Sequence, residues 1–138
     1  MPSFDFAHTV PMLFREDGLR LILSIIISRM DDLKTQLRKE FEKAQQARIS
    51  KNEGQARVCA RRAAGIAARD YLTRNGTQVP NMSAYDLLVL LKEDTNLSPD
   101  MQLIVDHLTV RVTEDFELPI DADLIAEARV LCDWLLNQ

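Results

Sequence analysis

Glycine and proline are scarce in this sequence, with 4 and 5 copies among 138 residues. Chains that turn often are rich in these residues, so a sandwich of many short strands is disfavoured. The only two cysteines, Cys59 and Cys132, are too few for a disulfide framework, and we expect them to be buried, reduced thiols. With 2 His in the chain, zinc-ligand motifs are missing, and no cofactor-binding motif occurs. We therefore expect no metal and no cofactor.

Long apolar runs are also missing. The run from Leu21 to Ile27 is interrupted by Ser24 and is too short to span a bilayer. No basic region precedes an apolar stretch at the N-terminus, so a secretory signal is not expected. Hydrophobic residues (46%) and charged residues (28%) are close to the globular average, which argues against disorder. These features predict a cytoplasmic protein that contacts no membrane.

Positive and negative charges are concentrated in different parts of the chain, although the net charge is only −4. Residues 31–75 hold 11 Lys/Arg and 6 Asp/Glu, while residues 84–138 hold 3 and 12. The basic part could contact phosphates and the acidic part a basic partner. Alternatively, the two parts neutralise each other between packed helices.

Apolar residues recur every three or four positions in the first third of the chain, which predicts a helix from Glu16 or Asp17. The string Ser50-x-x-Glu53 is a capping-box pattern, so we place the end of this helix and the start of the next there. One continuous helix to residue 74 would be about 87 Å long, too long for a domain of this size. Three further apolar residues predict that the first half of the helix is buried on more than one side: Leu21, Ile25 and Ile27.

The remaining sequence predicts four more helices. An alanine-lined helix runs to about Thr73 and stops before Gly76. Ser83 and Ser98 are predicted to cap the third and fourth helices, and Asp121 or a neighbour the last. The third helix is apolar nearly all round and is expected to be buried, the fourth extends to Val112, and 114–119 form a loop. The prediction is an all-α, antiparallel up-and-down bundle of about five helices over 14–138, after an N-terminal arm at 1–13.

Three strings, in this order and spacing, carry a resemblance to a known family. They are QARVCARRAAGIAARDYL at 55–72, YDLL at 85–88 and FELP at 116–119. Together with the long first helix, this order resembles the HEPN family (higher eukaryotes and prokaryotes nucleotide-binding domain) over about residues 17–136. The resemblance implies a helical bundle that commonly forms dimers. It also implies possible roles as a metal-independent, toxin-like ribonuclease or as the partner of a small nucleotidyltransferase.

The ribonuclease members of that family carry Arg, four to six residues, and then His. For His107 the arginine would have to occupy positions 100–102, which are Asp, Met and Gln. For His8 it would have to occupy positions 1–3, which are Met, Pro and Ser. The motif is therefore absent, and the resemblance does not carry ribonuclease activity to this chain.

Two sets of polar residues are candidates for sites. His107 and Arg111 lie four apart on the predicted fourth helix and would share a face, where they could bind phosphate or act in a divergent ribonuclease. The alternative is a mixed-charge surface helix. The second helix carries basic residues that are candidates for nucleotide or RNA binding, or for salt bridges within the bundle: Arg57, Arg61, Arg62 and Arg69.

An apolar surface and an acidic cluster complete the set. We expect the long first helix to form a homodimer through its apolar residues, with these as interface candidates: Leu19, Leu23, Ile26, Ile27 and Met30. Acidic residues around 114–123 lack the ligand spacing of a calcium loop, which favours a solvated loop over a cation site. The sequence as a whole predicts a non-catalytic binding module more than an enzyme.

Overall fold

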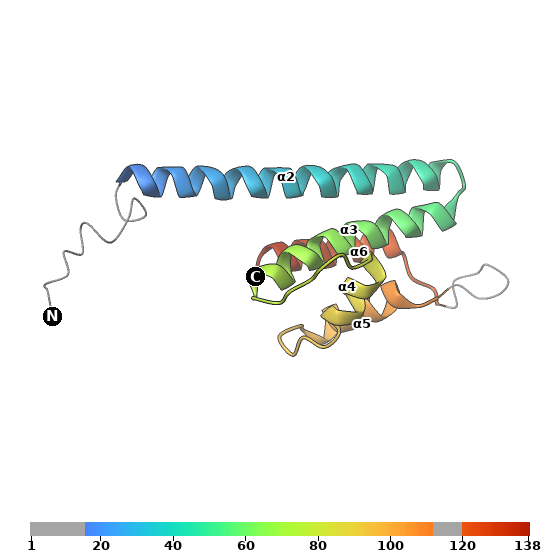
Figure 1. Ribbon diagram of the computed structural model, residues 1–138. Helices are drawn as coiled ribbons and strands as arrows, with labels where there is room; N and C mark the ends of the chain where they lie inside the picture. The colour runs from blue at the N-terminus through green and yellow to red at the C-terminus, as the bar shows by residue number, and fades with distance from the viewer. Residues whose placement is uncertain (1–15, 112–119) are drawn as a thin grey trace, which may run out of the picture. The chain divides into compact units, whose positions relative to one another are not determined.

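The computed structural model describes residues 16–111 and 120–138. In these ranges the chain forms helices and no strands, which confirms the all-α bundle (Figure 1). The predicted arm at 1–13, Val112 and the predicted loop at 114–119 lie outside the described residues. The helices are α2 (Glu16–Ile49), α3 (Glu53–Arg74), α4 (Ala84–Leu91), α5 (Pro99–Thr109) and α6 (Leu124–Leu136).

Contacts along the chain separate it into two units, residues 1–35 and residues 36–138, with the division inside α2. The described part of the first unit is the N-terminal portion of α2, residues 16–35. The second unit contains the last part of α2 and all the later helices.

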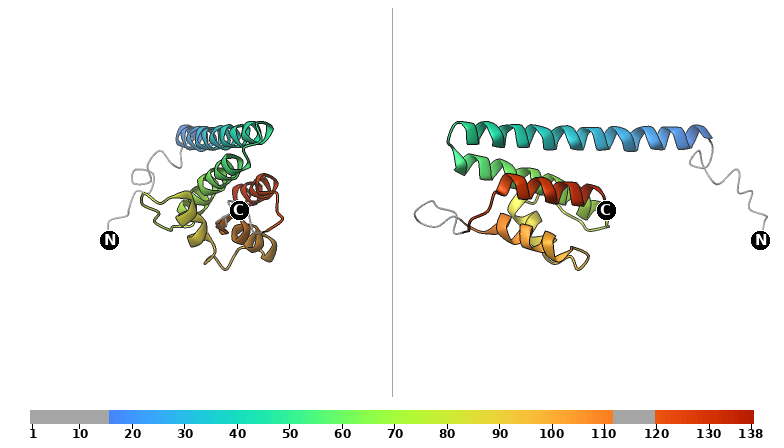
Figure 2. Two further views of the ribbon diagram at one scale, coloured as in Figure 1. Left: turned by 90° about the vertical axis from the view of Figure 1, so that its right-hand side faces the viewer. Right: turned by 180° about the vertical axis from the view of Figure 1, so that it is seen from behind.

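Helix α3 is at the centre of the second unit and contacts α6 and α4 most extensively, while α5 packs against both α4 and α6 (Figure 2). Six alanines of α3 are almost completely buried, which lets neighbouring helices approach closely. Helices α3 and α4 approach closely at Gly65, where an added Cβ would lie 2.7 Å from Cβ of Ala84. The alanines are Ala56, Ala60, Ala63, Ala64, Ala67 and Ala68.

The chain reversal after α2 lies where it was predicted, but Ser50 is not the cap. The side chain of Asn52 accepts a 3.1 Å hydrogen bond from the amide of Gln55 and is the N-cap of α3. Asn52 also donates its amide to the carbonyl of Ala47 at 2.7 Å, and Lys51 donates to Arg48 at 3.0 Å, so α2 ends in a Schellman motif. Lys51 occupies the left-handed position of that motif (φ 62°). Because Ser50–Asn52 form the hydrogen bonds that end α2, α3 starts two residues later than predicted.

The other predicted helix starts are confirmed. The hydroxyls of Ser83 and Ser98 accept hydrogen bonds from the amides of Asp86 (3.1 Å) and Met101 (3.3 Å). The last helix is capped by Asp123, a neighbour of Asp121, whose carboxylate accepts from the amide of Ala126 at 3.3 Å. These caps satisfy amides that have no partner within their own helices.

Two predictions about the middle of the chain are wrong. Helix α4 is not buried all round, because Tyr85 and Val89 on it are exposed. Helix α5 ends at Thr109 instead of extending to Val112, since Val110 is already extended (φ −65°, ψ 131°). At this end the guanidinium of Arg61, on α3, donates hydrogen bonds to the carbonyls of Leu108 and Val110. These acceptors are therefore satisfied without a further helical turn.

Candidate functional site

The most prominent surface in the described residues is apolar and lies on the N-terminal portion of α2. Seven large apolar side chains here are each between 41% and 59% exposed. They include all five residues predicted for a dimer interface. Five of the seven share one side of the helix, and we call these the exposed apolar face: Leu19, Leu23, Ile26, Ile27 and Met30.

The spacing of this face fits a helical partner. Leu19, Leu23, Ile26 and Met30 alternate four- and three-residue steps, the pattern with which one helix packs against another. Ile27 lies beside this stripe and widens it, whereas Leu21 and Ile25 project from the opposite side of the helix. The prediction that the first half of this helix is buried on more than one side is wrong for the single chain, because these side chains are 41–59% exposed. Contiguous apolar patches of this kind usually mark interaction sites.

Two of the four arginines predicted for nucleotide binding instead donate to backbone carbonyls. Arg61 donates from Nε to the carbonyl of Leu108 at 2.8 Å and from Nη2 to that of Val110 at 3.1 Å. Burial lowers the pKa of Arg61, and the neighbouring charge of Arg57 lowers it further. Arg69 donates to the carbonyls of Val79 and Met82, both at 2.9 Å. These two guanidinium groups hold a helix end and a loop in place.

The other two arginines lie differently. Arg62 is exposed on α3, while Arg57 is half-buried and its Nε has no hydrogen-bond partner among the described residues. Arg74, in the same helix, pairs with Asp70 at 2.7 Å and donates to the carbonyls of Leu135 and Gln138 at the end of α6. Of the basic residues of α3 predicted to bind phosphates, Arg62 is the one that is exposed.

His107 and Arg111 do not share a helix face, because α5 ends between them. Nδ1 of His107 lies 2.9 and 3.0 Å from the two carboxylate oxygens of Glu127 on α6. Arg111 lies beyond the helix end, with its guanidinium carbon 5.3 Å from the centre of the Tyr85 ring. The two residues are thus directed to different partners.

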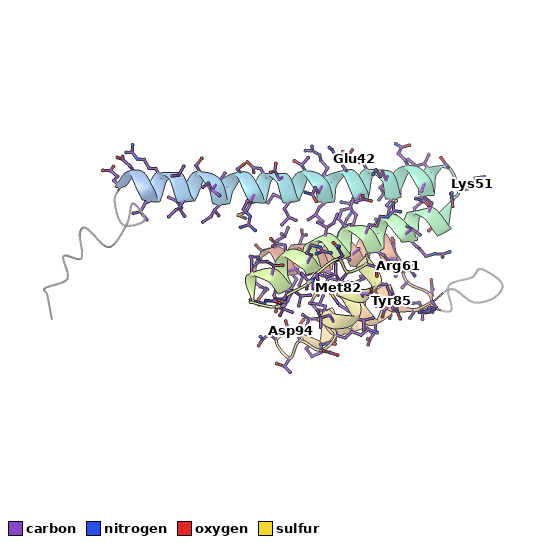
Figure 3. The ribbon with its side chains drawn as sticks, in the orientation of Figure 1. Glu42, Lys51, Arg61, Met82, Tyr85 and Asp94 are labelled. Atoms are coloured by element: carbon purple, nitrogen blue, oxygen red, sulfur yellow. The ribbon has the colours of Figure 1, made fainter. Side chains whose placement is uncertain are left out.

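A cavity of about 320 Å³ adjoins Arg111. It is lined by Arg61 from α3, by Tyr85 from α4, and by Thr109, Val110 and Arg111 at the end of α5. Figure 3 labels Arg61 and Tyr85. Both arginines already have a partner there, one the carbonyls of α5 and the other the tyrosine ring. The two guanidinium groups that line this cavity are therefore already held by other groups of the chain.

A second cavity, of about 350 Å³, lies within the second unit. We call it the α2–α3–α4 cavity, because it is lined by the last part of α2, by α3 and by the chain leading into α4: Gln36, Glu40, Arg62, Gly65, Ile66, Arg69, Met82, Ala84 and Leu87. Oε2 of Glu40 is buried there and has no hydrogen-bond partner in the described part of the chain. Sequence reasoning missed Glu40, although an acid between Leu37 and Phe41 in an apolar stripe was a visible signal.

The acidic and thiol groups of the described residues form no further site. In residues 16–111 and 120–138, no three potential ligands are grouped as a metal ion would require. Asp123 is engaged as a helix cap and in a 3.0 Å ion pair with Arg48. Cys59 and Cys132 are buried and unpaired with each other, and burial raises the pKa of the Cys132 thiol to about 12. A thiol with such a pKa is a poor nucleophile.

In comparisons with known proteins, no protein-family model, no curated protein and no solved structure matches this chain. None of the helices in the described ranges combines the length and apolarity needed to cross a bilayer.

Proposed function

We propose that this chain is a non-catalytic, HEPN-like helical module that acts by self-association. The exposed apolar face of α2 is the surface on which a second copy docks. The observation that carries this proposal is the half-exposure of seven large apolar side chains on one helix. A nucleotidyltransferase-type protein is the further partner that the family resemblance suggests for such a dimer, and nucleotides or RNA are the further ligands.

The energetics favour self-association. Removing the remaining half of each such side chain from water contributes about 1 kcal/mol. Two copies that bury the five residues of this face against each other would gain about 10 kcal/mol on this scale. The loss of translational and rotational freedom costs about 4–15 kcal/mol. The apolar gain is thus of the size that a stable dimer needs.

The test is the double substitution Leu23→Glu with Ile26→Glu, which places two carboxylates in the middle of the face. We expect it to weaken self-association at least 100-fold, because each charge would have to be buried without a partner. Light scattering after size exclusion measures the mass. Ile49→Glu is the matched control, because Ile49 is an exposed residue of the same helix (71%) outside the face. Self-association that survives the double substitution would refute the proposed surface.

A divergent, metal-independent ribonuclease is the second candidate, favoured by the contact between His107 and Glu127. A carboxylate at 2.9 Å from Nδ1 fixes the orientation of an imidazole, as in many acid–base histidines. This candidate predicts RNA cleavage in the absence of metal, and its loss in Arg111→Ala and His107→Ala. RNA left intact by the unaltered protein would dismiss it.

A further inference from the structure

Glu40 in the α2–α3–α4 cavity is an acceptor without an adequate partner. Its side chain is only 15% exposed, and Oε2 forms no hydrogen bond with any described residue. The cation that pairs with Glu40 is the ammonium group of Lys43, whose Nζ lies 3.6 Å from Oε1. The Lys43 side chain is 61% exposed. A buried carboxylate oxygen without a donor is costly. Rotation about the terminal torsion of Glu40, which is soft, can present either oxygen to an incoming donor.

Arg62 supplies the opposite charge in the same cavity. Its guanidinium forms no ion pair with Glu40, nor with any other carboxylate of the described ranges. Arg69 contributes further positive charge, but its Nη atoms donate to the carbonyls of Val79 and Met82. The cavity thus has on α2 a carboxylate with one oxygen that lacks a donor in the described residues, and on α3 an exposed cation that forms no ion pair with it.

Apart from Gln36, the rest of the lining is apolar. Ile66 and Leu87 come from α3 and α4, and Met82 is held in position through its carbonyl by Arg69. The close approach of α3 and α4 at Gly65 and Ala84 keeps these walls fixed. A volume of about 350 Å³ is at the lower end of the range of small-molecule sites. The site therefore suits a small ligand with an aliphatic part.

We propose that the α2–α3–α4 cavity binds a small zwitterion of the aliphatic amino-acid class. The ligand's ammonium group donates to the Glu40 carboxylate, and its carboxylate accepts from the Arg62 guanidinium. Its aliphatic side chain lies against Ile66, Met82 and Leu87. Binding at this site is independent of self-association through the exposed apolar face.

The first test is calorimetric titration of the full chain with L-leucine, L-leucinamide and N-acetyl-L-leucine. L-leucinamide lacks the carboxylate, and N-acetyl-L-leucine lacks the ammonium group. We expect L-leucine to bind and each analogue to bind at least tenfold more weakly. No binding of L-leucine, or equal binding of all three compounds, would overturn the proposal.

The second test uses substitutions at the two charged positions. Glu40→Gln and Arg62→Met should each weaken L-leucine binding at least tenfold, while Glu42→Gln should not change it. Glu42 is the matched control, because it is an exposed acid of the same helix whose contact is with Arg38 (3.7 Å). Arg62 is exposed, so its variant keeps the test valid if Glu40→Gln alters folding. Unchanged binding in Arg62→Met would contradict the assignment.

Discussion

Residues 19–30 and residues 37–44 of α2 carry apolar side chains at the same helical spacing, but in different surroundings. In the first segment the large apolar residues are 41–59% exposed. In the second, Leu37 and Phe41 are each 6% exposed and Ala44 is fully buried. The guanidinium of Arg129, on α6, lies over the Phe41 ring with its carbon 4.5 Å from the ring centre. The second segment thus has its partner within the chain.

The difference shows what helical periodicity predicts. It determines which side of a helix is apolar, and it does not determine what covers that side. For residues 37–44 the cover is in the same chain, whereas for residues 19–30 we propose that it comes from a second copy. The predictions below separate these two kinds of burial.

The largest effect is expected from truncating an apolar side chain in each segment. Phe41→Ala should lower the free energy of unfolding by about 3–5 kcal/mol, because it leaves a cavity in the core. Leu23→Ala should lower it by less than about 0.5 kcal/mol in dilute solution, because Leu23 is exposed in the single chain. Urea unfolding followed by circular dichroism measures both values.

The same pair of variants becomes more informative at high protein concentration. There the cost of Leu23→Ala should rise, because the side chain becomes buried in the dimer, while the cost of Phe41→Ala should stay constant. If the cost of Leu23→Ala also stayed constant at all protein concentrations, residues 19–30 would have no partner.

A smaller effect is expected where the buried segment of α2 ends. Lys51 has φ 62°, a conformation that side chains with a Cβ rarely adopt. Lys51→Gly should therefore stabilise the chain by about 1 kcal/mol. Gly76 has the equivalent position after α3 (φ 85°), so Gly76→Ala should destabilise the chain by a similar amount. Thermal unfolding of both variants checks the signs, and two changes of the same sign would contradict this explanation.

The smallest effect concerns the ion pair between Arg48, near the end of α2, and Asp123. Burial raises the pKa of the Asp123 carboxyl, but the Ala126 amide and the Arg48 guanidinium outweigh this and hold it below its ordinary value. Such a carboxyl stabilises the fold above its unfolded pKa of about 3.9, and this contribution is lost as the pH falls through the folded value. Asp123→Asn keeps a capping side chain but removes the charge.

We expect Asp123→Asn to cost a few tenths of a kcal/mol at pH 7, since the pair is largely exposed. The difference from the unaltered chain should shrink as the pH falls below about 3.9 and through the lower pKa of the folded Asp123 carboxyl, because the protonated carboxyl and the Asn side chain are both neutral. Urea unfolding at several pH values measures it, and a difference that grows as the pH falls would contradict the assignment.

Much of the fold could be predicted because its signals are local. Ser83, Ser98 and Gly76 each act within one turn of their own position, through a side-chain cap or a left-handed backbone. The apolar spacing predicted the long first helix in the same way. Asn52 was missed because Ser50-x-x-Glu53 is an equally good local pattern, and only the bonds that end α2 decide between them.

The candidate sites were harder to predict because they depend on contacts between distant residues. Arg61 donates to carbonyls 47 and 49 positions away, and nothing near it in the sequence indicates this role. The separation of His107 from Arg111 follows from the same contact, since it satisfies the end of α5. Glu40 was detectable as an acid in an apolar stripe, but its cavity exists only because α3 and α4 pack beside it.

The most direct test of the exposed apolar face is the mass of the unaltered chain by sedimentation equilibrium. With a chain mass of 15.7 kDa, we predict a concentration-dependent rise from this value to twice this value within the micromolar range. A mass of one chain at every concentration up to several hundred micromolar would contradict the account.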